Sequence, residues 1–167
     1  MSGNARELQG EFWSAIDKDR TVMLACEGVY PRPMTALAEN ARGPIWFFTS
    51  KENDLAQAVT RNARPGLLML ASKGHDLFAT AGGTLSMDND PAVIDRLWNP
   101  FVAAWYEGGK QDPKLRLLRF DPDAAEIWRN DSSLLAGIKM MIGIDPKQSY
   151  EDDVATVNLR GGRRRKR

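Results

Sequence analysis

The spacing of hydrophobic residues changes within the first thirty positions of the chain. Leu8, Phe12 and Ile16 lie four residues apart, which predicts an amphipathic helix over residues 5–18. The next apolar run, TVMLACEG, is continuous and contains β-branched residues. That composition predicts a strand over residues 21–28, closed by a glycine.

Two further extended segments are predicted before residue 50. The prolines of VYPRPMTALAEN cannot occupy a helix interior, so we expect an extended segment that begins near Arg32. After the turn ARGP, the apolar run IWFF predicts a strand over residues 45–48. Because connections this short cannot form parallel crossovers, the three strands are expected to form an antiparallel meander.

The middle of the chain alternates a short helix with two strands. DLAQAVTRN predicts a helix capped by Asn53 or Asp54, and strands are expected over residues 66–74 and 77–87. The second strand is interrupted by Gly82 and Gly83, as in a β-bulge or sharp bend. Such a bend is one way to curl a sheet into a barrel.

The last third predicts more helix and two more strands. A helix is expected over residues 91–109, broken or kinked at Pro100, followed by strands over 115–123 and 125–130 and an amphipathic helix over 132–144. About seven short strands with a few helices favour a mainly β, α+β fold, a small barrel with helical additions. We expect one domain over residues 1–145 and a polar, flexible tail over 146–167.

Composition narrows the functional classes. The 167 residues are 43% hydrophobic and 27% charged with net charge +1, which is typical of a soluble globular protein. No apolar run approaches the roughly 20 residues of a membrane span, and MSGNARELQG lacks a secretory pattern, so we expect a cytoplasmic protein. A single cysteine, Cys26, and a single histidine, His75, argue against a disulfide, a metal site and a Ser-His-Asp triad.

The basic end GGRRRKR is the one charge asymmetry. We interpret it as a flexible, solvated tail; the alternative is an arm that binds nucleic acid or another acidic surface. Aromatic residues are not interleaved with these cations, so nucleic-acid binding is not expected beyond the tail.

The stretch IWFFTSKENDL combines a strand end with a helix start. Free backbone N–H groups at such a junction, together with Thr49, Ser50 and Lys51, would suit an anion such as a phosphate. The alternative is that Ser50 and Asn53 only cap the helix and that Lys51 is solvated.

Arg32 adds a second cation to this prediction. A hairpin would place the strand of Arg32 beside IWFF, with Arg32 near Thr49 and Ser50. A guanidinium fork and two hydroxyls form a reasonable phosphate cradle, and Met34 with the aromatic wall of residues 46–48 could flank a flat ring. The alternative is that these aromatic side chains are simply buried in the core, as is common for strands that carry such rings.

An ordered series of segments resembles the flavin-binding split-barrel family related to pyridoxamine 5′-phosphate oxidase, in particular its bacterial general stress protein branch. The series is RPMTAL, IWFFTSKENDLAQAV, GGTLSMDNDPAVIDRLWNPFVAAWYEGGKQDP and LRLLRFDPDAAEIW, within residues 8–145. The resemblance implies a six-stranded antiparallel split β-barrel with peripheral helices and a homodimer that holds FMN at the subunit interface. The flavin contacts implied by the resemblance, together with the charged and polar candidates from the preceding paragraphs, are Arg32, Pro33, Met34, Thr35, Phe48, Thr49, Ser50, Lys51, Asn53, Trp98 and Trp105.

One departure from the family pattern bears on the cofactor. Where the family commonly has a serine and a lysine directed at the phosphate, this chain has Asn53 and Leu55. An asparagine can still donate a hydrogen bond, but a leucine cannot bind an anion. Lys51 could supply the missing charge; otherwise FMN would bind weakly, or another flavin such as FAD would be preferred.

The resemblance leaves three functional hypotheses. The first is an FMN-dependent oxidoreductase that uses NAD(P)H, in which the flavin ring carries the chemistry and no side-chain acid or base is needed. The second is a stress protein that buffers or senses flavin without turnover, and the third is a barrel whose site has decayed at Leu55. Pyridoxamine phosphate oxidation itself is not favoured, because the C-terminal arginine-histidine element of that enzyme is missing.

Overall fold

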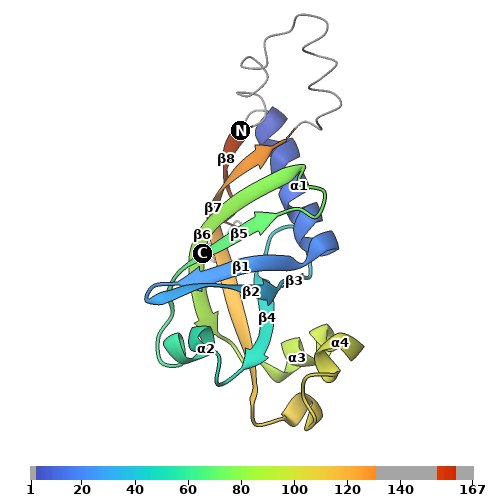
Figure 1. Ribbon diagram of the computed structural model, residues 1–167, viewed down its shortest axis with the longest axis vertical. Helices are drawn as coiled ribbons and strands as arrows, with labels where there is room; N and C mark the ends of the chain where they lie inside the picture. Colours follow the sequence, from blue (N-terminus) through green and yellow to red (C-terminus); the bar gives the residue numbers. More distant parts are fainter. Residues whose placement is uncertain (1–2, 131–153, 161–167) are drawn as a thin grey trace, which may run out of the picture.

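The computed structural model describes residues 3–130 and 154–160 (Figure 1). In chain order the elements are α1 (Gly3–Asp19), β1 (Thr21–Cys26), β2 (Val29–Thr35), β3 (Leu37–Ala38), β4 (Ile45–Ser50), α2 (Asp54–Ala58), β5 (Arg64–Ala71), β6 (Leu77–Met87), α3 (Pro91–Leu97), α4 (Pro100–Ala103), the 3₁₀ turn η1 (Gly109–Gln111), β7 (Leu115–Arg129) and β8 (Val154–Asn158).

The strands form one antiparallel sheet that curls into a half-barrel. Its order is β2-β1-β5-β6-β7-β4-β3, with β8 also paired to β7. β2 and β4 are not neighbours in this order, yet they come into contact across the open side of the barrel. We call the gap between these two strands the split. The fold is therefore the split-barrel α+β fold that the sequence predicts.

Helix α1 supplies a large part of the core. Leu8, Phe12 and Ile16, the residues that predict the helix, are completely buried. The helix lies along one side of the sheet and contacts β3, β6, β7 and β8 (Figure 1). Apolar spacing of four residues thus identifies both the helix and the face that it buries.

The irregularity predicted at Gly82 and Gly83 is confirmed in position, but the bulge lies on the partner strand. Gly82 pairs with Ala124 and Gly83 pairs with Pro122, so the extra, bulged residue is Asp123 of β7. A Cβ at Gly83 would lie 2.3 Å from the carbonyl oxygen of Asp121, whereas a Cβ at Gly82 would meet no atom within 4 Å. Glycine at position 83 permits the close backbone approach that curls the sheet.

The predicted strand arrangement is partly wrong. The β1–β2 hairpin forms, and β3, at the end of the predicted extended segment, pairs with β4; however, β2 itself does not pair with β4, so the meander is interrupted between β2 and β3. The strands expected over 115–123 and 125–130 are one continuous strand, β7, which contains the proline at position 122 and carries the bulged residue directly after it. Within the described residues the sheet has eight strands, whereas the resemblance implies six.

The predicted flexible tail over 146–167 is wrong for residues 154–160. Residues 154–158 form β8, and the side chains of Val157 and Leu159 are buried in the main core. The apolar residues of VATVNL alternate as in a strand, but charged residues surround this short segment, so the prediction did not include it. The helix expected over 132–144 and the basic end at 161–167 lie outside the described residues.

The expected helix over 91–109 is divided into α3, α4 and η1, so the break predicted at Pro100 is confirmed. These turns form an arm that packs on β4 and β7 through a second, smaller core. That core contains Trp46, Leu117 and Ile94, with Trp98 and Tyr106 packed against it. The arm is thereby held beside the split. No helix within 3–130 or 154–160 is long and apolar enough to cross a membrane.

Candidate functional site

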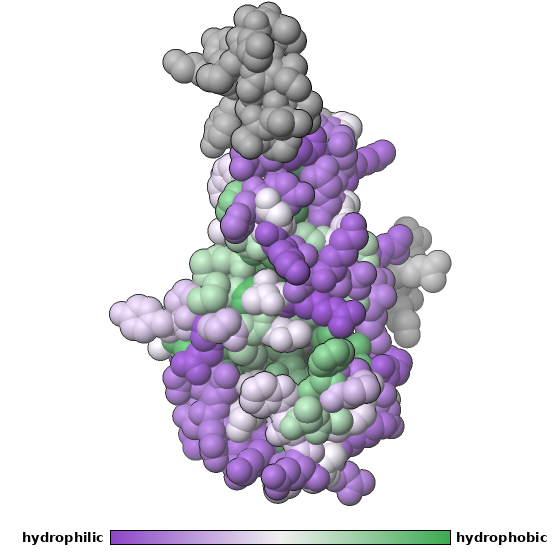
Figure 2. Space-filling view, turned by 45° about the vertical axis from the view of Figure 1, so that its right-hand side comes forward, coloured by the Kyte–Doolittle hydropathy of each residue, from purple (hydrophilic) through white to green (hydrophobic). Residues whose placement is uncertain are grey.

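A cavity of ≈ 860 Å³ lies in the split, between β2, β4, the arm and the end of α1. Figure 2 shows hydrophobic side chains gathered on the lower part of the face that carries the arm. The residues that line the cavity are Asp19, Arg20, Thr21, Pro33, Met34, Thr35, Leu37, Phe48, Thr49, Ser50, Asn99, Phe101, Val102, Trp105 and Tyr106. The volume falls in the range of pockets that hold cofactors and drug-sized ligands.

The β4 wall changes from apolar to polar as the strand ends. Phe48 packs edge to face against Trp98 of the arm, with ring centroids 6.0 Å apart. Thr49 follows with only 6% of its surface exposed, and the Ser50 hydroxyl accepts a hydrogen bond from Glu52 N at 3.2 Å. Thus a buried hydroxyl and a turn hydroxyl lie at the end of an aromatic wall.

Arg32 reaches across the split from β2 to α2. Its Nη2 lies 2.5 Å from the Asp54 carboxylate. Its Nε is buried and has no hydrogen-bond partner among the described residues. A buried N–H without a partner is costly, so this atom is suited to an acceptor from a ligand.

In the turn that leads into α2, side chains of the turn itself accept hydrogen bonds from the backbone N–H groups. Asn53 Oδ1 accepts from Leu55 N at 2.9 Å and so caps the helix, as the alternative interpretation predicts, while its Nδ2 lies 4.0 Å from Met34 Sδ. Lys51 is exposed and does not line the cavity. Leu55 is 0% exposed and belongs to the main core, so its side chain is turned away from the split.

The arm forms an aromatic wall opposite the strands. Phe101 and Trp105 are 82% and 84% exposed, although Asn99 fixes the first turn of α4 by accepting hydrogen bonds from Phe101 N and Val102 N. Burial raises the pKa of Tyr106 to about 12, with a smaller contribution from the nearby Asp112 carboxylate. Its phenol is therefore protonated at neutral pH and can donate a hydrogen bond.

The structure brings most of the predicted residues together. Seven of them line the cavity: Pro33, Met34, Thr35, Phe48, Thr49, Ser50 and Trp105. Arg32, Lys51, Asn53 and Trp98 are not among the lining residues. Arg32 adjoins the lining Pro33 on β2, Asn53 Nδ2 lies 4.0 Å from the lining Met34 Sδ, and Trp98 packs against Phe48. The hairpin that was expected to bring Arg32 to β4 forms only at the end of the predicted segment, where β3 pairs with β4. Arg32 lies in β2, which pairs with β1 and contacts β4 across the split.

The sequence interpretation missed the end of α1. Asp19, Arg20 and Thr21 line the cavity, and nothing in their spacing marks them as a site. The neighbouring aromatic residues Phe101 and Tyr106 could have been found, because they lie in the same Trp-rich segment as Trp105.

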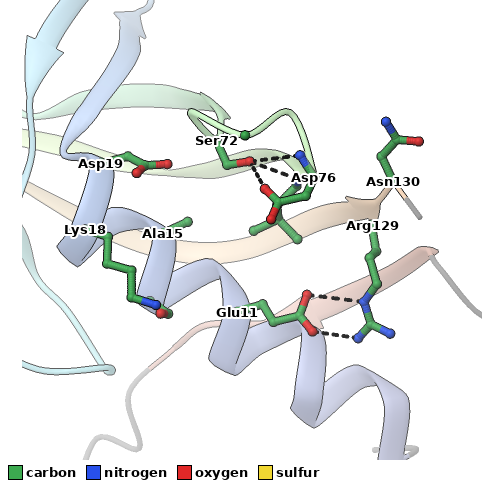
Figure 3. Close-up of a pocket in the computed structure, with 11 residues that line it drawn as sticks. Glu11, Ala15, Lys18, Asp19, Ser72, Asp76, Arg129 and Asn130 are labelled. Atoms are coloured by element: carbon green, nitrogen blue, oxygen red, sulfur yellow. Dashed lines mark hydrogen bonds and ion pairs between the residues drawn. The ribbon is translucent and has the colours of Figure 1, made fainter. Parts of the chain in front are cut away.

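A smaller pocket of ≈ 440 Å³ lies between α1 and the β5–β6 turn (Figure 3). Its charged side chains largely pair with each other: Arg129 Nη2 lies 2.8 Å from Glu11, and the Ser72 hydroxyl donates to Asp76, which is the main reason that the pKa of Asp76 is lowered. This pairing makes it a less suitable site than the split for a large planar ligand.

No group of three or more His, Cys, Asp or Glu side chains suited to a metal occurs in the part of the chain that the structure describes. Cys26 is buried, and burial raises the pKa of its thiol. The candidate site therefore consists of aromatic surface, hydroxyl groups and arginine, rather than of metal ligands or a nucleophile.

Comparison with known proteins gives one consistent group. The family model described as pyridoxamine 5′-phosphate oxidase like matches residues 7–151. The chain is 58% identical to the general stress FMN/FAD binding protein of Xanthomonas citri, with 80% of this chain and 96% of that chain covered and a TM-score of 0.73.

Two other solved structures belong to the same group. The chain is 58% identical to a general stress family protein of Xanthomonas campestris pv. campestris, covering 83% of this chain and 97% of that one, with a TM-score of 0.74. It is 29% identical to general stress protein 26 of Jannaschia sp. CCS1, covering 92% and 99%, with a TM-score of 0.78. No curated protein matches the chain.

Proposed function

The chain belongs to the pyridoxamine 5′-phosphate oxidase-like family, and from that membership we propose that it is a flavoprotein that holds FMN in the split. The observation that carries the proposal is a ≈ 860 Å³ cavity lined by Pro33, together with the Nε of the adjoining Arg32, which is buried and has no partner in the described part of the chain. The general stress protein of Xanthomonas citri, described as FMN/FAD binding, supports a flavin as the ligand.

The residues present fit a flavin phosphate at the β2–β4 end of the split. Arg32 Nε offers a free donor, and its Nη2 can exchange the half-exposed Asp54 carboxylate for a phosphate oxygen. The hydroxyls of Thr49 and Ser50 lie on the neighbouring wall. A guanidinium with hydroxyl groups is a frequent solution for phosphate recognition, and neither Lys51 nor position 55 is required.

The remainder of the cavity fits a flat aromatic ring. Pro33 and Met34 on one side and Phe48 on the other offer apolar surface, and the aromatic side chains of the arm cover the outer side. When bound, the flavin supplies hydride or single-electron chemistry through its own ring. The protein binds and orients that ring and limits its access to water.

We further propose that the protein works as a cytoplasmic homodimer with the flavin at the subunit interface. In support, β1, β5 and β6 leave Met23, Leu67 and Phe78 about 40% exposed on the outside of the barrel. Leu67 lies opposite Ala25 in the sheet and Met23 lies opposite Met69, so these side chains form a continuous apolar surface. Such a surface is typical of a protein interface.

The proposed activity is that of an oxidoreductase that uses NAD(P)H, and the alternative is a stress protein that binds flavin without turnover. The exposed arm aromatics Phe101 and Trp105 favour the first, because a second planar molecule could stack in the open part of the cavity. Anaerobic bleaching of the bound flavin by NADPH or NADH separates the two: a flavin inert to both nicotinamides would leave only the binder.

The site itself is tested by removing the phosphate contacts. We expect the double variant Arg32→Ala/Thr49→Ala to lose FMN affinity at least tenfold while its affinity for riboflavin, which lacks the phosphate, changes little. Arg160→Ala/Thr84→Ala is a matched control, because it removes an arginine and a threonine away from the cavity. Equal FMN affinity in the two double variants would reject the phosphate site, and absence of flavin binding by the unmodified protein would reject the proposed function.

A further inference from the structure

Arg20 has an unusual backbone conformation. It follows α1 directly and has φ 59°, in the left-handed region that residues with a Cβ rarely adopt. Glycine is strongly preferred at this position after a helix, because it takes the conformation without steric cost. Among the described residues, only His75, with φ 57°, shares this feature without being glycine.

The fold gives no reason for an arginine at this position. The Arg20 carbonyl accepts from Ala36 N at 2.6 Å, a contact that any residue would make. The exposed side chain makes a single hydrogen bond within the described residues, from Nε to the Asp17 carbonyl at 3.2 Å. Because a locally unfavourable residue is commonly retained for function, the guanidinium itself is the feature to explain.

The location of Arg20 supplies an explanation. Arg20 lines the same cavity as residues of β2 and β4, and its guanidinium is exposed to solvent. Ala36, its partner, lies four residues after Arg32, so Arg20 and Arg32 are separated by about 13 Å along β2 at roughly 3.3 Å per residue. Arg20 therefore lines the cavity well away from Arg32, the residue beside the lining Pro33.

Asp19 also lines the cavity, but its carboxylate is engaged elsewhere. Its Oδ2 accepts a hydrogen bond from Lys73 N at 2.8 Å in the β5–β6 turn, and the carboxylate points into the smaller pocket between α1 and that turn (Figure 3). At this end of the cavity, Arg20 is therefore the charged residue to consider.

We propose that Arg20 binds the pyrimidine edge of the flavin ring, at the end opposite the phosphate. This inference rests on the proposed function. The pyrimidine edge carries two carbonyl groups on either side of an imide N–H, so Arg20 donates a hydrogen bond to one of the carbonyl groups. A guanidinium at this edge also stabilises the reduced ring, which carries more negative charge there, and so raises the reduction potential of the bound flavin.

The test replaces Arg20 by the residue that the backbone prefers. Arg20→Gly removes the guanidinium without straining the turn, so its melting temperature should not fall below that of the unmodified protein. We expect its affinities for FMN and for lumiflavin, which has the ring but no phosphate, to fall by the same factor of about ten or more. The reduction potential of its bound FMN should also become more negative.

Two matched variants make the result specific. His75→Gly relieves the same backbone conformation outside the cavity and should change neither affinity nor potential. Arg32→Ala should weaken FMN but not lumiflavin. Unchanged lumiflavin affinity in Arg20→Gly, or an unchanged reduction potential, would overturn the inference. If the unmodified protein binds no flavin, the proposed function itself fails, so the two failures are distinguishable.

Discussion

Leu55 offers the sharpest test of how the site is built. The family pattern has a phosphate-binding lysine at this place, so Leu55→Lys restores the family residue. In the structure, however, the Leu55 side chain is 0% exposed and lies in the main hydrophobic core. We therefore expect Leu55→Lys to destabilise the fold and to leave FMN affinity no higher.

The magnitude follows from burial. Removing a buried leucine side chain costs roughly 2–5 kcal/mol, and each unit by which a buried lysine must lower its pKa adds about 1.4 kcal/mol. We expect a loss of about 4 kcal/mol or more, which is a large part of the roughly 5–15 kcal/mol that stabilises a typical domain.

Urea unfolding followed by tryptophan fluorescence measures the loss, and an FMN titration below the transition measures affinity. Gln57→Lys is the matched control: it adds the same charge to the exposed face of the same helix and should change stability by no more than about 0.5 kcal/mol. A Leu55→Lys variant as stable as Gln57→Lys, with tighter FMN binding, would show that position 55 faces the phosphate and would refute the burial argument.

Two further predictions concern the sheet and the arm. Gly83→Ala should destabilise the protein by about 3 kcal/mol, because its Cβ would lie 2.3 Å from the Asp121 carbonyl oxygen. Gly82→Ala should cost less than about 1 kcal/mol, because its Cβ would meet nothing within 4 Å. Equal urea midpoints for the two variants would contradict the close approach at Gly83. The pKa of Tyr106 is raised to about 12, so between about pH 10 and 12 the unfolded chain loses this proton and the folded protein keeps it. Stability should therefore fall with rising pH in that window, and less steeply in Tyr106→Phe; parallel pH profiles of melting temperature would show that Tyr106 is not desolvated.

The sequence predicted local structure better than strand pairing. Leu8, Phe12 and Ile16 identified α1, and the two adjacent glycines identified the bulge, because spacing and missing side chains act locally. The pairing of β4 with β7 joins residues about seventy positions apart, and no local pattern specifies it. β8 was missed for the same reason: its five residues become a strand only against β7.

The sequence predicted the part of the candidate site that lies on β2 and β4. It missed the residues that only the tertiary structure brings to the cavity. The family resemblance identified the residues from Pro33 to Thr35 and from Phe48 to Ser50. Arg20 could not be recognised, since only its backbone conformation and its place in the cavity distinguish it from other charged residues. From its residue type alone, Leu55 was interpreted as a lost phosphate contact. Its burial in the main core shows that its side chain is turned away from the split.

The two prolines of β2 explain why the split stays open. Leu24 and Arg32 are opposite one another, so Arg32 can direct its N–H to β1, and alternation then directs positions 31 and 33 to the other edge. Pro31 and Pro33 have no N–H, so this free edge cannot extend the ladder to β4. β2 and β4 therefore meet through side chains and leave the cavity between them, while the Arg32–Asp54 pair joins β2 to α2 just beyond the end of β4. The proline-rich sequence that marks the family segment thus prevents barrel closure, and the unclosed seam forms the cavity that we propose as the flavin site.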